Sequence, residues 1–85
     1  MSAIVSPKAE KQIRKLSKLD QLAVMQKILA LPNVPLVKQL VGYKGIYRTR
    51  VGDYRIVYRQ DGENCYIELV GHRRDIYKIL ERMWS

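Results

Sequence analysis

The fold is decided by residues 47–58, which read YRTRVGDYRIVY. Basic residues alternate here with aromatic and β-branched ones, the period-two pattern of a strand with two different faces. The pattern is interrupted at Gly52-Asp53, a two-residue hairpin signal. With this pair at the tip, Arg50 lies directly opposite Arg55. The segment therefore predicts an antiparallel hairpin that carries arginines on one face.

A third strand is expected to extend this hairpin into a meander, with Asp61-Gly62 as its second tip. That tip places Glu68 opposite Arg55. The face expected to pack on helices carries Tyr47, Thr49, Val51, Tyr54, Ile56, Tyr58, Cys65, Ile67 and Leu69. The opposite face carries Arg48, Arg50, Arg55, Val57, Arg59, Tyr66 and Glu68.

The residues before the hairpin predict one strand and two helices. Residues 3–5 form a short apolar run, expected to be an edge strand, and Ser6-Pro7 ends it. A helix is expected over 8–16, with Ala9, Ile13 and Leu16 inward and Lys8, Lys11, Lys15 and Lys18 facing solvent. A second helix is expected from a cap at Ser17 to about Leu31, with Leu22, Met25, Ile28 and Leu29 inward.

The end of the chain predicts a final helix from Arg73 onward, marked by Ile76, Ile79, Leu80 and Met83. A start at Arg73 puts Tyr77 one turn later on the same face. The expected order is β-α-α-β-β-β-α, an α+β fold in which an antiparallel sheet packs on an N-terminal helical hairpin.

Composition restricts the class of function. The 85 residues make one domain, 1–85, with a formal charge of +8 and a pI near 9.9, which predicts a polyanionic partner such as nucleic acid or an acidic protein. One cysteine and no Cys/His cluster predict neither disulfides nor a metal site, and no cofactor is expected. No apolar run approaches a membrane span, so we expect a cytoplasmic protein without membrane contact.

The facing arginines point toward a phosphate ligand. Placing Arg50 opposite Arg55 costs about 0.2–1 kcal/mol relative to a neutral pair, so stability alone does not favour it. A phosphate would relieve the repulsion and accept bidentate hydrogen bonds. A solvated face that prevents edge pairing is the competing interpretation. Glu68 beside Arg55 is either an orienting partner or an ordinary cross-strand salt bridge.

Residues 47–58, together with GHRRDIY at 71–77, resemble the RelE/ParE superfamily of bacterial and archaeal toxins. The resemblance extends over the N-terminal strand and helices and so covers nearly the whole chain. It implies the toxin of a type II toxin–antitoxin system, a ribosome-dependent endoribonuclease that cleaves translated mRNA. It also implies a cognate antitoxin of the RelB type; for a toxin of charge +8, we expect that antitoxin to be acidic.

The resemblance assigns roles by position. The catalytic set falls on Arg48, Arg50, Arg55, Arg73 and Tyr77, with the tyrosine stacking on a base. Contacts to RNA or the ribosome are expected from Lys8, Lys11, Lys15, Lys18, Arg59 and Arg74. The best-studied members have lysines where Arg48 and Arg50 stand, and an arginine with a pKa above about 12 is a poor proton acceptor. The general base is therefore unassigned.

His72 is the nearby side chain whose ordinary pKa, about 6.5, suits proton transfer near neutral pH. The alternative is that it only shapes the turn while the arginines act by position and charge. Two other functions stay open: a ParE-like toxin that binds and poisons DNA gyrase without nuclease activity, and an inactive relic that still binds an antitoxin.

Overall fold

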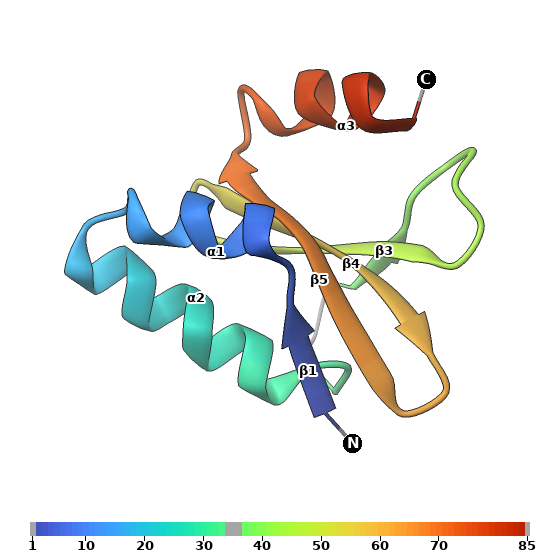
Figure 1. Cartoon of the computed structure of the whole chain (residues 1–85), viewed down its shortest axis with the longest axis horizontal. Coiled ribbons are helices and arrows are strands. Elements are labelled where there is room, and N and C mark those ends of the chain that lie inside the picture. Colours follow the sequence, from blue (N-terminus) through green and yellow to red (C-terminus); the bar gives the residue numbers. More distant parts are fainter. Residues whose placement is uncertain (1, 34–36, 85) are drawn as a thin grey trace.

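The structure, a computed structural model, describes residues 2–33 and 37–84 (Figure 1). The described elements are β1 (Ser2–Val5), α1 (Pro7–Arg14), α2 (Lys18–Ala30), β2 (Lys38–Gln39), β3 (Ile46–Val51), β4 (Tyr54–Asp61), β5 (Asn64–His72) and α3 (Ile76–Trp84). The strands form one sheet in the order β1-β5-β4-β3-β2. The α+β class is thus confirmed. Within these ranges, no helix is long and apolar enough to cross a membrane.

The sheet differs from the expected one at both edges. β1 is an edge strand as expected, but it pairs parallel with β5, so the sheet is mixed rather than antiparallel. At the other edge, β2 pairs antiparallel with β3 and brings Lys38 opposite Arg48. The expected order β-α-α-β-β-β-α has no strand at this position, because two residues are too few to show a period-two pattern.

The first hairpin has the predicted register. β3 and β4 pair with Val51 opposite Tyr54 and Arg50 opposite Arg55. Gly52 has a φ of 57°, a left-handed conformation that glycine adopts without steric cost. The local turn therefore fixes which residues face each other.

The second hairpin has a different register. Asp61 pairs with Asn64, so the tip is Gly62-Glu63 rather than Asp61-Gly62. A bulge between Val57 and Tyr58 shifts the pairing again. As a result, Gly71 and not Glu68 lies opposite Arg55.

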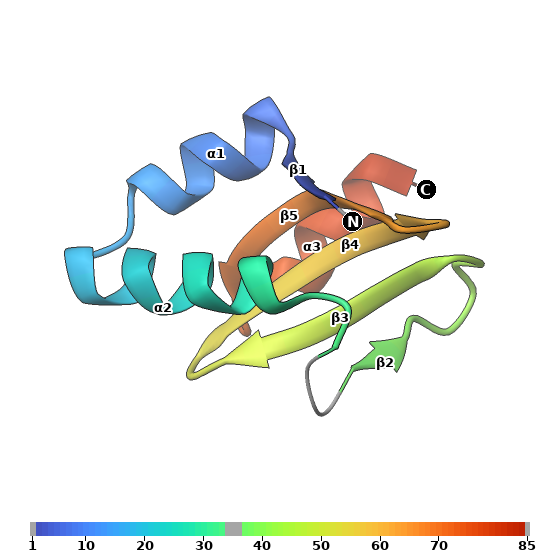
Figure 2. The ribbon, with the colours of Figure 1, turned by 90° about the horizontal axis from the view of Figure 1, so that it is seen from below.

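Each face of the sheet has its own core, and Figure 2 shows how the three helices are arranged around the sheet. Helices α1 and α2 cover one face, where Ala9, Ile13, Val24 and Ile28 pack on Ile56, Tyr58 and Ile67. Helix α3 lies on the other face, where Ile76 and Leu80 pack on Val57 and Leu69. Val57 lies on the face predicted for it, where α3 buries it, whereas Leu69 was expected to face the first core and this expectation is wrong. The bulge between Val57 and Tyr58 explains the change of face at Leu69.

The lysine-bearing side of α1 is exposed to solvent, as predicted. It begins at Pro7 with Ser6 as its cap, whose Oγ accepts a hydrogen bond from the Ala9 N–H at 3.0 Å. The four lysines of the predicted stripe, Lys8, Lys11, Lys15 and Lys18, are all exposed.

Helix α2 begins after its predicted cap, Ser17, but buries a different face. Val24 and Ile28 are buried, whereas Leu22, Met25 and Leu29 are exposed. The expectation that these three face the core is wrong. Because α2 is apolar around most of its circumference, its periodicity could not select the buried side.

Helix α3 begins at Ile76, three residues later than expected, and residues 73–75 form a turn. Gly71 lies at the point where α3 returns over the sheet. A Cβ at this position would lie 3.1 Å from Ile76 Cδ1, so the absence of a side chain permits the close approach. This turn carries Arg73 toward the β3–β4 hairpin.

Candidate functional site

Four cations line one cavity on the α3 side of the sheet. The cavity has a volume of about 240 Å³ and is lined by Lys38, Arg48, Thr49, Arg50 and Arg55. These residues come from three adjacent strands, β2, β3 and β4. Cross-strand pairing sets Lys38 opposite Arg48 and Arg50 opposite Arg55. The structure thus brings together three of the arginines predicted from sequence and adds a lysine.

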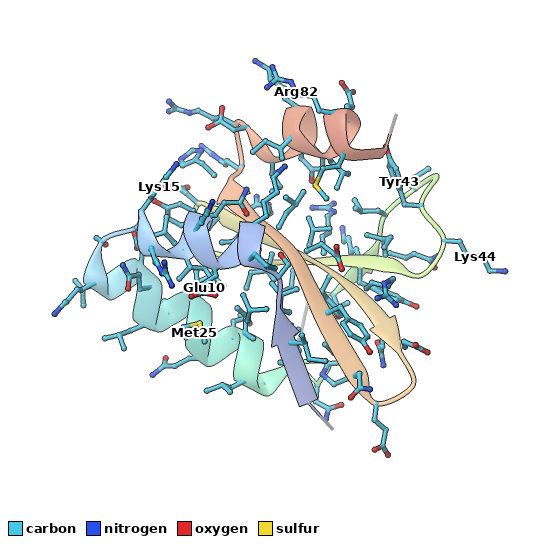
Figure 3. The ribbon with its side chains drawn as sticks, viewed as in Figure 1. Glu10, Lys15, Met25, Tyr43, Lys44 and Arg82 are labelled. Atoms are coloured by element: carbon cyan, nitrogen blue, oxygen red, sulfur yellow. The ribbon has the colours of Figure 1, made fainter. Side chains whose placement is uncertain are left out.

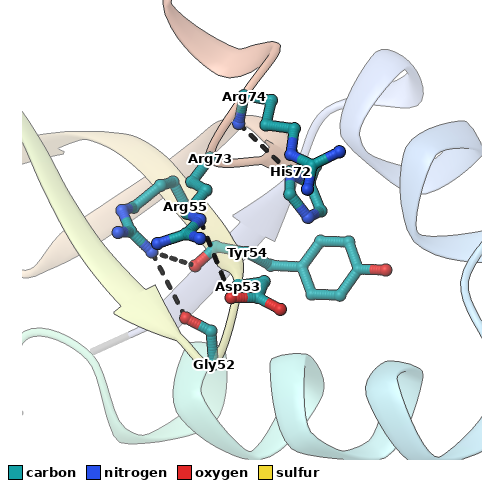
Figure 4. Close-up of polar contacts among 7 residues, drawn as sticks. All are labelled: Gly52, Asp53, Tyr54, Arg55, His72, Arg73 and Arg74. Atoms are coloured by element: carbon teal, nitrogen blue, oxygen red, sulfur yellow. Dashed lines mark hydrogen bonds and ion pairs between the residues drawn. The ribbon is translucent and has the colours of Figure 1, made fainter.

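Arg55 is held by the hairpin turn beside it (Figure 4). Its Nη1 donates hydrogen bonds to the carbonyl oxygens of Gly52, at 3.3 Å, and Tyr54, at 3.2 Å. Glu68, the partner expected for Arg55, lines a separate cavity with Lys44 and Arg59. The bulge after Val57 is the reason for the different neighbour.

Arg73 reaches the same hairpin from the turn before α3 (Figure 4). Its backbone N–H donates to the Asp53 carbonyl at 2.8 Å, and its Nε lies 3.8 Å from Asp53 Oδ1. The backbone bond fixes the position of the turn, while the ion pair is exposed and therefore weak. Arg73 thus lies beside the hairpin turn that carries Arg55.

Tyr77 lies next to Arg48 rather than pairing with Arg73. The Arg48 guanidinium carbon is 6.0 Å from the centre of the Tyr77 ring, and the tyrosine is 43% exposed. The expected one-turn spacing from Arg73 to Tyr77 is wrong because α3 begins only at Ile76. The exposed ring is available for stacking on an unpaired base.

His72 lies at a second cavity, of about 380 Å³, which it lines with Asp20, Asp53 and Tyr54. Its ring contacts the Tyr54 ring edge-on with centroids 5.8 Å apart, and its Nδ1 accepts a hydrogen bond from the Arg74 N–H at 3.1 Å. Burial, followed by the charge of Asp20, raises the pKa of the Tyr54 hydroxyl. The structure does not place His72 in the arginine-lined cavity.

The remaining predicted RNA contacts are spread over the surface. Lys8, Lys11, Lys15 and Lys18 lie on α1 and α2, which cover the opposite face of the sheet. Arg59 stacks on Tyr66 with its guanidinium carbon 4.2 Å from the ring centre. Arg74 is exposed in the turn before α3. None of these six residues lines the 240 Å³ cavity.

Lys38 is the site residue that sequence reasoning missed. A single lysine outside any expected strand or helix carries no signal, and its position depends on β2 pairing with β3. Over the ranges 2–33 and 37–84, no group of three or more His, Cys, Asp or Glu side chains could hold a metal ion. The candidate site is therefore an array of cations with one aromatic ring.

Comparison with known proteins places this arrangement in a family. The family model described as "ParE toxin of type II toxin-antitoxin system, parDE" matches residues 3–77. Toxin RelE3 of Methanocaldococcus jannaschii is 42% identical over 41 residues, which is 48% of this chain and 47%, about half, of that relative.

Solved structures have the same fold. The toxin–antitoxin complex RelBE2 of Mycobacterium tuberculosis contains a chain with 29% identity and a TM-score of 0.72, covering 85% of this chain and 96% of that one. A double arginine-to-alanine mutant of the E. coli toxin RelE in the free state gives a TM-score of 0.73 at 20% identity, covering 98% and 96%. With a family model that spans residues 3–77, this chain belongs to the RelE/ParE superfamily, the toxins of type II toxin–antitoxin systems.

Proposed function

We propose that this toxin is a ribosome-dependent endoribonuclease that cleaves translated mRNA. The observation that carries the proposal is the cavity lined by Lys38, Arg48, Arg50 and Arg55. Four cations around one small cavity can bind a phosphodiester and stabilise the negative charge that develops on it during the reaction. The exposed ring of Tyr77 beside Arg48 matches an unstacked base next to that phosphate.

The proposed reaction uses the RNA's own nucleophile. The 2′-oxygen forms a bond to the adjacent phosphorus, and the bond from phosphorus to the 5′-oxygen breaks. The proton of the 2′-hydroxyl passes to a base, and the leaving 5′-oxygen takes up a proton. Products are a 2′,3′-cyclic phosphate and a 5′-hydroxyl. Arg48, Arg50 and Arg55 stabilise the pentavalent phosphate, while Arg73 lies near the leaving group.

Lys38 is our candidate for the proton acceptor. A guanidinium keeps its proton throughout the physiological range, whereas a neutral lysine amine can accept one. Lys38 lies opposite Arg48 and lines the same cavity as the arginines, whereas His72 lines a different one. An enzyme without a strongly activated base fits a reaction in which the ribosome supplies much of the rate by positioning the message.

We further propose that the partner is an acidic antitoxin. The charge of +8 and the exposed cations attract an acidic chain that folds on contact and covers the arginine-lined cavity. The similar fold in Mycobacterium tuberculosis comes from a toxin–antitoxin complex, which supports a protein partner of this class.

A second function, gyrase poisoning, is favoured by one observation: the matching family model is that of the ParE toxin. In that case the cations would bind a protein or DNA, and no RNA would be cut. Translation arrest without DNA damage distinguishes the nuclease from the gyrase poison.

The deciding experiment maps 5′ ends by primer extension on a defined mRNA, with and without translating ribosomes. We expect discrete cuts within the translated region, and weak cutting of naked RNA. Equal cutting without ribosomes would contradict ribosome dependence. Intact RNA in both reactions, together with loss of gyrase supercoiling, would support the ParE-like function instead.

A further inference from the structure

The tip of the β3–β4 hairpin holds two arginines through three consecutive carbonyl oxygens. The first and third, those of Gly52 and Tyr54, accept hydrogen bonds from Arg55 Nη1. The second, that of Asp53, accepts the Arg73 N–H at 2.8 Å. Figure 4 shows both arginines at this tip. One short turn therefore sets the position of Arg55 relative to Arg73, although the two residues belong to separate segments of the chain.

Asp53 also contacts Arg73 through its side chain. Its Oδ1 lies 3.8 Å from Arg73 Nε, and the side chains of Asp53 and Arg73 are 66% and 58% exposed. A guanidinium is a planar fork of five N–H donors. A carboxylate on the Nε side of this fork leaves the terminal amino groups for a second acceptor.

A carboxylate at this place is not explained by attraction between the chain and RNA. The chain carries a formal charge of +8, and a negative charge beside its arginines weakens their attraction for phosphate. Asp53 lines the cavity of His72 and not the arginine-lined cavity, so its carboxylate lies outside the proposed phosphate site. Any effect of Asp53 on the reaction must therefore pass through Arg73.

We propose that Asp53 is a positioning residue, whose carboxylate orients Arg73 toward the leaving 5′-oxygen of the RNA. This inference rests on the nuclease function proposed above and concerns the departure of the leaving group. As the bond from phosphorus to the 5′-oxygen breaks, negative charge grows on that oxygen, and the terminal N–H groups of Arg73 donate to it. Because Asp53 holds the Nε edge beforehand, the orientation is set before the RNA binds.

The expected effect of removing the carboxylate is modest, and its sign is informative. An exposed ion pair biases an orientation by only about 1.4- to 5-fold, and more where solvent and salt screen it less, as in a complex with the ribosome. Asp53→Asn keeps the side-chain shape and the backbone acceptor. It also adds one unit to the positive charge of the chain, which by attraction alone would strengthen RNA binding. A positioning role predicts the opposite, a slower reaction.

The test measures single-turnover cleavage on ribosomes programmed with a short synthetic mRNA. One version of the mRNA has the natural 5′-oxygen at the cleaved bond, and the other has a bridging sulfur in its place. Glu10→Gln is the matched control for Asp53→Asn. Glu10 is likewise an exposed carboxylate paired with an arginine, Arg14, but it lies on α1, across the sheet from the arginine-lined cavity (Figure 3).

We expect a defect that depends on the leaving atom. On the oxygen substrate, Asp53→Asn should cleave about three- to tenfold more slowly than the wild type and the control, with no loss of ribosome binding. On the sulfur substrate the three proteins should cleave at the same rate. A thiol has a pKa of about 8.5, so the thiolate leaves without a donor. In an Arg73→Ala background, Asp53→Asn should have no further effect.

Three results would overturn the inference. The first is an equal rate for Asp53→Asn and the wild type on the oxygen substrate. The second is an equal fall on both substrates, because the substitution would then only loosen the turn. The third is faster cleavage by Asp53→Asn, which would show that the carboxylate merely opposes RNA binding. A wild-type chain that cleaves neither substrate would instead contradict the proposed nuclease function, and the role of Asp53 with it.

Discussion

Arg55→Ala should separate cleavage from folding. In the folded chain, Arg55 is half-buried, faces Arg50 across the hairpin and donates two long hydrogen bonds to the carbonyl oxygens of Gly52 and Tyr54. Truncation relieves about 0.2–1 kcal/mol of like-charge repulsion. It also loses hydrogen bonds worth about 0.5–1.5 kcal/mol each, and less where solvent replaces them.

The two contributions oppose each other, so we expect the free energy of unfolding to change by no more than about 1–2 kcal/mol. For a chain of this size each kcal/mol corresponds to about 4–8 °C in the melting temperature. The effect on cleavage should be much larger. Removing one preorganised donor to a developing charge costs about 10²–10³-fold in the chemical step.

The assay is single-turnover cleavage on ribosomes programmed with a defined mRNA, together with a thermal melt of the same preparation. Arg82→Ala is the control, because Arg82 is an exposed arginine on α3 outside the cavity; it should cleave like the wild type. A folded Arg55→Ala protein that cleaves at the wild-type rate would falsify the role of the cavity. Loss of folding would show that Arg55 is a structural residue.

Three further substitutions test the roles of Lys38, His72 and Tyr58. Lys38→Arg keeps the positive charge but removes the proton acceptor. The rate of single-turnover cleavage should therefore fall about 10²-fold or more, while ribosome binding is retained. A wild-type cleavage rate would exclude Lys38 as the base. His72→Gln should change the cleavage rate less than about tenfold, because His72 lines a different cavity. A larger loss, together with a wild-type cleavage rate that depends on pH near neutrality, would identify His72 as the proton-transfer group. Tyr58→Phe removes a buried hydroxyl with no hydrogen-bond partner among the described residues, and should raise the free energy of unfolding by about 1 kcal/mol in urea melts near pH 8. Burial raises the pKa of Tyr58 from 10.0 to about 12, so the unfolded chain loses this proton at a lower pH than the folded chain. The free energy of unfolding of the wild type should therefore fall between pH 10 and 12. Tyr58→Phe should lack this part of the fall, and identical pH profiles for the two proteins would contradict the explanation.

The parts of this protein that depend on local geometry could be predicted from its residues. The register of the β3–β4 hairpin follows from Gly52-Asp53, because a two-residue turn and a period of two leave one pairing that buries the apolar face. That register places Arg50 opposite Arg55, and so the centre of the candidate site could be predicted. The caps of α1 and α2 at Ser6 and Ser17 are likewise local.

Other parts depend on contacts between separate elements and could not be predicted. Lys38 joins the site only because β2 pairs with β3. The bulge that moves Leu69 to the α3 side and sets Gly71 opposite Arg55 depends on the packing of both cores. The apolar pattern of α2 is compatible with several buried faces, so its contact with the sheet selected Val24 and Ile28 and left three leucines outside. In each case the residues in contact are far apart in the sequence, and no local pattern could specify which would meet.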